Sequence, residues 1–203
     1  IIPGVRAFCE REGVDAWLRE GGMLRVSAAP AQDPAVDEEV DAARELGVPE
    51  EAVPLSSDEL AGRIRSPVFR RGVFLRDAAT VHPGRLALGV RRAALGRVRL
   101  YEHTHVKRID DGVVSTTRGR VRAKDVVVAV NAAAAGWKPL RRRITVFGSY
   151  VVLTEPVPEL LEQIAWTGGE AVIDGRMFLH YFRTTNAGRV LMGSGSGPIG
   201  FGG

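Results

Sequence analysis

The spacing of apolar residues along the chain predicts five helices. Between residues 33 and 47, apolar side chains recur every three or four positions, Asp33 can cap the amino terminus and Gly47 can end the helix. Ser56 and Glu59 have the spacing of a capping box at the start of another helix. The predicted helices lie around residues 5–9, 33–46, 56–64, 82–96 and 157–165.

Other apolar segments predict strands. Gly21 and Gly22 separate two short runs and predict a β-hairpin within residues 14–28. The uninterrupted run VVVAV, residues 126–130, is typical of a strand that is covered on both faces. Further extended segments or strands are predicted at residues 72–77, 98–110, 113–123, 144–156, 169–174, 176–185 and 189–194, with a hairpin turn at 186–188.

The order of these elements predicts a mixed α+β and α/β fold. Successive strands in the last third imply an antiparallel sheet. By contrast, a buried strand that runs into the small residues of NAAAAGW, residues 131–137, resembles the carboxyl end of a parallel strand, where ligands collect. We therefore expect an α/β segment at residues 72–137, flanked by the two parts of an antiparallel-sheet domain at residues 1–71 and 138–203.

The amino-acid composition indicates the cellular compartment of the protein and excludes some classes of binding partner. The 203 residues contain no apolar run near the roughly 18 residues that cross a bilayer, so we expect a cytoplasmic protein without a membrane partner. The single cysteine, Cys9, excludes an internal disulfide. The net charge of +4 is the excess of 28 basic over 24 acidic residues. Only three of the basic residues are lysines, and this preference for arginine is typical of GC-rich genomes. The dense basic run at residues 138–143 has one aromatic neighbour, so we expect no nucleic-acid partner.

Two motif-like patterns carry little chemistry. Residues 195–200, GSGPIG, match GxGxxG after a strand, but Pro198 interrupts the motif and no helix follows, so a flexible loop is the better interpretation. His103 and His105 would share one face of a strand, yet no nearby cysteine or carboxylate completes a metal site. We therefore predict no metal centre, and the absence of a nucleophile elbow argues against a hydrolytic triad.

Arg183 is the candidate binding residue that the pattern itself singles out. It lies inside an apolar strand pattern, with Tyr181 two positions away on the same face. A mostly buried guanidinium needs an anionic partner, because desolvating it unpaired is costly. That partner is an internal carboxylate, which the residues alone favour, or a substrate carboxylate held bidentately.

Five segments in a fixed order carry a resemblance to a known family. Together they resemble the D-amino-acid-oxidase-like flavoproteins, in particular bacterial FAD-dependent oxidoreductases of the glycine oxidase, sarcosine oxidase and gamma-glutamylputrescine oxidase type. The segments are GVFLRDAATVHPGRLALGVRRAA, VRLYEHTHVKRI, GRVRAKDVVVAVNAAAAGW, GSYVVLTEP and HYFRTTNAGRVLMGSG.

The resemblance implies how the domains are composed. In that family an amino-terminal Rossmann unit binds the FAD pyrophosphate, and an antiparallel substrate domain interrupts the FAD-binding domain. This chain would then hold the substrate domain and the middle segment of the FAD-binding domain, with residues 72–137 as that segment. It would lack the phosphate loop and would be inactive without the remainder of the same chain.

The resemblance also implies cofactor contacts. The segment HVKRI places Val106 where the family contacts the adenine end of FAD through the backbone. The segment VNAAAAGW places Asn131, Ala132 and Trp137 along the cofactor, where small side chains allow close approach.

The implied reaction is oxidation of a C–N bond in a small amine or amino acid. Arg183, after Tyr181, matches the arginine that clamps the substrate carboxylate, while hydride passes from the substrate carbon to flavin N5 and the imine hydrolyses. The alternative is a non-catalytic α+β module that binds a carboxylate on its antiparallel sheet. An arginine-rich nucleic-acid binder is the third hypothesis.

Overall fold

The chain forms two compact units. The computed structural model describes residues 1–195 and 199–201. Unit 1 comprises residues 1–89 and 148–198, and unit 2 comprises residues 90–147 and 199–203. Both contain strands as well as helical segments, so the predicted mixed α and β fold class is confirmed. The domain boundaries expected at residues 71 and 137 stay a prediction.

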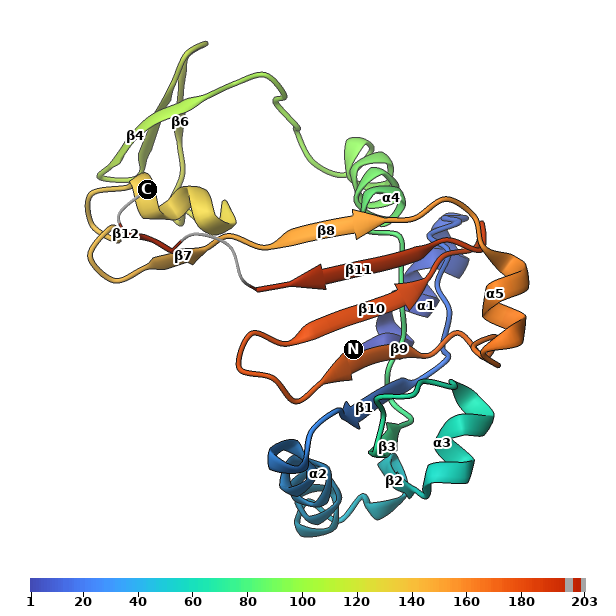
Figure 1. The fold of residues 1–203 in the computed structure, drawn as a ribbon. Coiled ribbons are helices and arrows are strands. Elements are labelled where there is room, and N and C mark those ends of the chain that lie inside the picture. The colour runs from blue at the N-terminus through green and yellow to red at the C-terminus, as the bar shows by residue number, and fades with distance from the viewer. Residues whose placement is uncertain (196–198, 202–203) are drawn as a thin grey trace. The chain divides into compact units, whose positions relative to one another are not determined.

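Unit 1 is built on a seven-stranded mixed sheet (Figure 1). Its β1 and β9 pair in parallel, and every other neighbouring pair is antiparallel. The spatial order is β2 (Ala52–Leu55), β3 (Arg71–Leu75), β1 (Met23–Ser27), β9 (Ala171–Asp174), β10 (His180–Thr184), β11 (Val190–Ser194) and β8 (Tyr150–Leu153).

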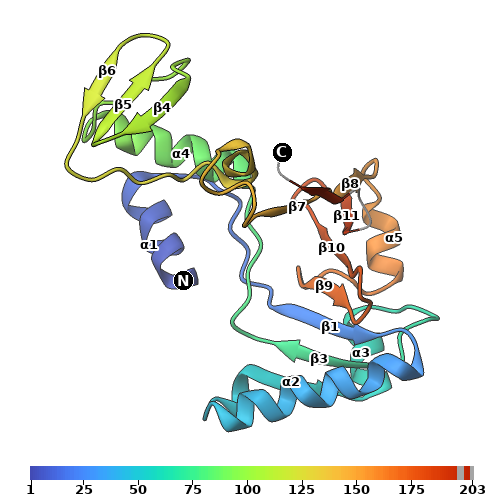
Figure 2. The ribbon, with the colours of Figure 1, turned by 90° about the vertical axis from the view of Figure 1, so that its left-hand side faces the viewer.

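Hydrophobic clusters lie on both faces of this sheet. On one face, Leu24 and Val172 pack with side chains of α3 and α5 around Trp166. On the opposite face, Val73 packs against α2, which lies along the β1–β3 side in Figure 2. The helices are α1 (Ile2–Glu12), α2 (Asp33–Glu45), α3 (Ser57–Arg63), α4 (Pro83–Leu95) and α5 (Pro158–Gln163), with short 3₁₀ turns at Pro30–Gln32 and Pro49–Glu51.

Unit 2 contains two small antiparallel sheets. A tight turn at Asp111 and Gly112, both with positive φ, joins the first two strands of a three-stranded meander. Its strands are β4 (Val106–Asp110), β5 (Val113–Thr116) and β6 (Arg120–Arg122). The 3₁₀ segment Asn131–Gly136 follows, and then β7 (Thr145–Phe147) pairs with β12 (Ile199–Phe201).

The helix signals in the sequence were accurate. All five predicted helices form, and Ser56 and Glu59 make the reciprocal bonds of a capping box. Asp33 is the exception in detail, because it is the first helical residue of α2 and does not cap it. Leu46, the last residue of the predicted helix, lies beyond its observed end and is 79% exposed.

The predicted hairpin at Gly21 and Gly22 is wrong. Residues before it pair with a distant segment instead, since Arg19 bridges Thr80, and Gly22 donates its N–H to Ala78. The two glycines serve close packing: a Cβ at Gly21 would stand 2.5 Å from the Gly169 carbonyl, and Gly22 has φ +74°. The glycine pair therefore marks a close approach between segments.

The prediction of a buried strand at residues 126–130 is also wrong. These residues form no strand, and all are exposed, Val127 to 90%. β-branched residues favour extended backbone, but a strand also needs a neighbour to complete its hydrogen bonds. Within the described residues no segment pairs with this one.

Two predicted strands are shorter than expected. The segment at residues 144–156 divides at Gly148 and Ser149, where β7 ends its pairing with β12 and β8 begins to pair with β11. Residues 176–179 form a loop because the Asp174 carboxylate accepts the N–H groups of Arg176 and His180 and so closes a turn.

Two further predictions concern the histidines at positions 103 and 105 and the glycine motif. His103 and His105 precede β4, so the shared strand face expected for them is wrong. In the glycine motif at residues 195–200, Gly197 and Pro198 lie outside the described residues.

Hydrogen bonds of Asp33 at the start of α2 predict how the stability of the fold depends on pH. Asp33 accepts hydrogen bonds from Arg70 and from the Ser27 hydroxyl, and these bonds lower the pKa of its carboxyl group. A depressed pKa in the folded state stabilises the fold above the unfolded value near 4, and that contribution disappears as the pH falls through the folded pKa. We expect Asp33→Asn to lower the urea midpoint by a constant amount between pH 5 and 8. The difference from wild type should shrink below about pH 4; a difference that grows in acid would contradict this assignment.

Candidate functional site

Strand β10 carries Tyr181 and Arg183 on one face of the unit 1 sheet. Tyr181 lies opposite Gly193 of β11, and Arg183 lies opposite Leu191. Side chains at paired positions share a face, and side chains two residues apart along a strand lie about 7 Å from each other. The two predicted site residues are therefore brought together as neighbours.

This face is open beside β8, where Val151 and Leu153 pair with β11 and remain 54% and 52% exposed. The hydrophobic cluster around Trp166 lies on the opposite face, and the partly buried Phe182, the residue between Tyr181 and Arg183, packs against it. The Arg183 side chain thus projects over a partly apolar, accessible surface. We call the surface formed by Tyr181, Arg183, Leu191, Gly193, Val151 and Leu153 the open face.

Arg183 has no partner among the described residues. It is half-buried, and no carboxylate lies within 4 Å of its guanidinium, nor does it make a hydrogen bond there. The internal salt bridge that the residues alone favoured is therefore wrong for the described part of the chain. Five guanidinium N–H groups remain available for an anion that comes from outside it.

Tyr181 is held in place by contacts that the sequence analysis missed. Its hydroxyl lies 2.6 Å from the Ser149 hydroxyl, which in turn donates to the Ser194 carbonyl at 3.1 Å. Its ring occupies space that a side chain at position 193 would fill, because a Cβ there would stand 2.3 Å from Tyr181 Cζ. A glycine inside a predicted strand was the available signal for such a close approach.

These contacts fix the direction of the tyrosine proton. Serine has one hydroxyl proton, and Ser149 gives it to the Ser194 carbonyl. Tyr181 is then the donor in its bond to Ser149, and its oxygen keeps a free lone pair as an acceptor. The open face therefore presents a cation at Arg183 and an acceptor at Tyr181.

Unit 2 holds the other predicted site residues. Asn131 and Ala132 line a cavity of about 290 Å³ together with residues 144–147. Asn131 adopts φ +49°, which turns the chain sharply into the 3₁₀ segment. Trp137 ends that segment and is half-buried, and Val106 begins β4 and is 46% exposed; neither lines this cavity.

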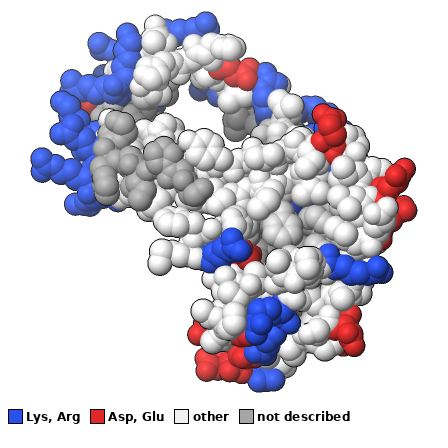
Figure 3. All heavy atoms as spheres, in the orientation of Figure 1, with Lys and Arg blue, Asp and Glu red and all other residues white. Residues whose placement is uncertain are grey.

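Charge is unevenly distributed over the molecule. Figure 3 shows basic side chains gathered over β4 to β6, in segments such as VKRID and RVR, and a mostly uncharged surface over β8, β10 and β11. The described residues include no cluster of three His, Cys, Asp or Glu side chains suited to a metal. Among them, no helix has both the length and the apolar character to span a membrane.

The close contact at Gly193 can be tested by mutation. We expect Gly193→Ala to displace the Tyr181 ring, break its bond to Ser149 and lower stability by about 1–3 kcal/mol. In a Tyr181→Ala background the same change should cost much less, because the obstructing ring is gone. Urea unfolding of the four proteins in this double-mutant cycle measures the coupling, and additive effects would contradict the assigned contact.

The chain is similar in sequence to bacterial oxidoreductases. It is 31% identical over 150 residues to "Probable oxidoreductase OrdL" of Rhizobium meliloti, covering 68% of this chain and 33% of the relative. It is 28% identical to "Gamma-glutamylputrescine oxidoreductase" of Escherichia coli, covering 94% of this chain and 46% of the relative. The chain thus spans less than half the length of these curated relatives.

Solved structures show the same fold. Glycine oxidase from Geobacillus kaustophilus superposes with a TM-score of 0.73 at 22% identity, covering 98% of this chain and 53% of that one. L-proline dehydrogenase from P. horikoshii gives a TM-score of 0.71 at 16% identity, covering 94% and 52%. The sequence profile of DAO, described as FAD dependent oxidoreductase, matches residues 2–202. The chain therefore belongs to the DAO family of FAD-dependent oxidoreductases.

Proposed function

We propose that the whole protein oxidises a C–N bond of a small amine or amino acid, with the open face as its substrate-binding surface. The observation that carries this proposal is the half-buried Arg183, which has no partner among the described residues. A guanidinium in a partly apolar setting is costly unless an anion completes it. A substrate carboxylate supplies that anion and matches the planar fork of the side chain.

Tyr181 adds a reason to favour an amino acid over a simple carboxylate. Its oxygen has a free lone pair because its proton is committed to Ser149. A substrate whose carboxylate binds Arg183 can donate an amine N–H to this oxygen. Accepting from the amine also orients the C–N bond, and no general base is needed when the amine binds in its neutral form.

The cavity in unit 2 supports a role in FAD binding. Its lining combines the small Ala132 with Asn131, whose left-handed backbone exposes the start of the 3₁₀ segment. Small side chains allow a planar ring system to approach the backbone, so this surface fits a cofactor of that kind. In our proposal Asn131 and Ala132 contact FAD within this cavity, while Val106 and Trp137 contact it outside the lining.

The exposed run at residues 126–130 supports a role for the rest of the whole protein. Its valines have no strand neighbour among the described residues, and their exposure is unfavourable in water. The curated relatives are more than twice as long as the matched region. We propose that this run packs against another part of the whole protein and that FAD binding needs both parts.

In this proposal the cofactor and the residues of the open face have separate roles. Bound flavin supplies the acceptor for the hydride that leaves the substrate carbon. Arg183 fixes the carboxylate, and the Tyr181 oxygen holds the amine. The apolar side chains of Val151, Leu153 and Leu191 limit water around the bound substrate.

The carboxylate clamp predicts a selective defect in the whole protein. We expect Arg183→Ala to weaken binding of an amino-acid substrate by roughly tenfold to a hundredfold, because charge-assisted hydrogen bonds are lost, while FAD affinity stays unchanged. Anaerobic flavin reduction, followed by absorbance over a range of substrate concentrations, measures the first quantity. Fluorescence titration with FAD measures the second.

The matched control is Arg44→Gln, because the Arg44 side chain lies on the solvent-facing side of α2, where it is 63% exposed and pairs with Asp41. It should change neither quantity. Equal loss of substrate and FAD binding in Arg183→Ala, or no loss of either, would contradict the clamp. A whole protein that binds amino acids but never reduces flavin would favour the alternative of a non-catalytic carboxylate-binding module.

The cofactor cavity predicts a complementary defect. Ala132→Leu adds three carbon atoms to the lining and should weaken FAD binding roughly tenfold. Ala133→Leu is the control, since Ala133 is exposed and does not line the cavity. Equal effects of the two substitutions on the FAD dissociation constant would show that FAD does not enter this cavity.

A further inference from the structure

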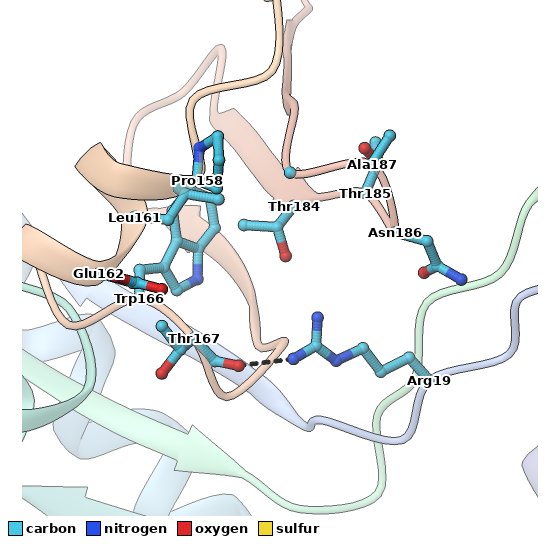
Figure 4. A pocket seen from close by; sticks show the side chains of 11 residues that line it. Arg19, Pro158, Leu161, Glu162, Trp166, Thr167, Thr184, Thr185, Asn186 and Ala187 are labelled. Carbon is cyan, nitrogen blue, oxygen red and sulfur yellow. Dashed lines mark hydrogen bonds between the residues drawn. The ribbon is translucent and has the colours of Figure 1, made fainter.

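A second concave site lies at the far end of the β10–β11 hairpin. This pocket has a volume of about 460 Å³ and is formed entirely by unit 1 (Figure 4). Its walls come from α5, from the hairpin turn and from the segment before β1. Its lining residues include Arg19, Pro158, Leu161, Glu162, Trp166 and Thr184.

The position of Arg19 is fixed before any ligand binds. Its backbone N–H and C=O form two hydrogen bonds with Thr80, at 2.9 and 2.8 Å. Its guanidinium crosses Gly169 and donates from Nη2 to the Thr167 carbonyl at 2.6 Å. A Cβ at Gly169 would stand 1.9 Å from Arg19 Nε, so this path requires glycine. Preorganisation of this kind lowers the entropic cost of binding.

Thr184 supplies a second donor. The residue is 8% exposed, yet its hydroxyl makes no hydrogen bond with any described residue. In Figure 4 this hydroxyl points toward the Arg19 guanidinium, with open space between the two. The hydroxyl is not among the buried polar atoms without a partner, so it is accessible from the pocket that Thr184 lines, and a ligand oxygen placed between these groups would accept from both.

The pocket is separate from the open face. Successive side chains of a strand point to opposite faces of the sheet, so Thr184 and Arg183 project in opposite directions. Thr184 lies on the side of Phe182 and Trp166, which belong to the hydrophobic cluster there. A molecule held by Arg183 therefore cannot also contact Thr184.

Opposite charges lie at the two sides of the pocket and indicate the kind of ligand that would fit it. Glu162 lies on the α5 side, across the pocket from Arg19 in Figure 4. Neither side chain forms an ion pair with a described residue. The apolar wall between them comes from Pro158, Leu161 and Trp166. Such a site favours a molecule with an anionic end, a short apolar body and a cationic end.

We propose that this pocket binds a small zwitterionic carboxylate, independently of the proposed oxidation on the open face. The carboxylate accepts hydrogen bonds from Arg19 and Thr184, and the cationic nitrogen lies toward Glu162. The body of the molecule packs on the apolar wall. The site adds a second ligand-binding surface to the same sheet.

Glycine betaine is a suitable probe, because its quaternary nitrogen has no lone pair and it cannot be oxidised to an imine. Isothermal titration calorimetry is carried out on the whole protein with Arg183→Gln as background, which removes the carboxylate partner on the open face. We expect saturable binding in this background. Adding Arg19→Gln should weaken it at least about tenfold, and adding Thr184→Val, which keeps the side-chain shape, about threefold to tenfold.

Two comparisons complete the test. Glu162→Gln should weaken betaine binding but leave the binding of acetate, which has no cationic end, unchanged. Arg65→Gln is the matched control, because this arginine also donates to a backbone carbonyl, that of Gln163, outside the pocket. It should have no effect.

Several outcomes would overturn the proposal. Absence of betaine binding in the Arg183→Gln background is one, and equal binding with and without Thr184→Val is another. If Arg19→Gln fails to fold, the effect of Thr184→Val on betaine binding tests the proposal by itself. Loss of flavin reduction in Arg183→Gln with betaine binding retained would separate this site from the proposed function.

Discussion

Packing of the partly buried Phe182 against the Trp166 cluster determines which way β10 faces, and both candidate sites of unit 1 depend on it. The Phe182 ring packs edge-on against Trp166, with centroids 5.6 Å apart, and stacks near Phe69 at 6.3 Å. Because side chains alternate along a strand, this burial directs Tyr181 and Arg183 to the open face. A register slip of one residue would place the arginine in the hydrophobic cluster, so the sheet specifies the register strongly.

Glycine positions then determine how closely the functional side chains fit. Gly193 leaves room for the Tyr181 ring on the open face, and Gly169 leaves room for the Arg19 guanidinium at the pocket. In both cases a Cβ would overlap the side chain that the site needs. The same Gly169 also approaches Gly21, so one small residue serves both the packing before β1 and the path of Arg19 to the pocket.

The sequence predicted those features whose interactions lie close together along the chain. Ser56 and Glu59 begin α3 through bonds within one helical turn, and Arg183 was identified from a period of two along one strand. The hairpin at Gly21 and the buried strand at residues 126–130 failed because pairing partners are set by distant segments. Ser149 and Arg19 were missed for the same reason, since their partners Tyr181 and Thr167 are remote in sequence.

The contrast between arginines in unit 1 bears on function. Arg6, Arg63 and Arg71 each pair with a carboxylate, at positions where the side chain is 37% to 47% exposed. Arg183 is half-buried among apolar neighbours and has no such partner in the described chain. Surface pairing contributes little to stability, whereas an uncompensated guanidinium in a partly apolar setting is destabilising. Arg183 thus lacks the carboxylate that Arg6, Arg63 and Arg71 have, which supports the proposal that a ligand neutralises its charge. The free acceptor on Tyr181 supports a ligand that carries an amine as well as a carboxylate.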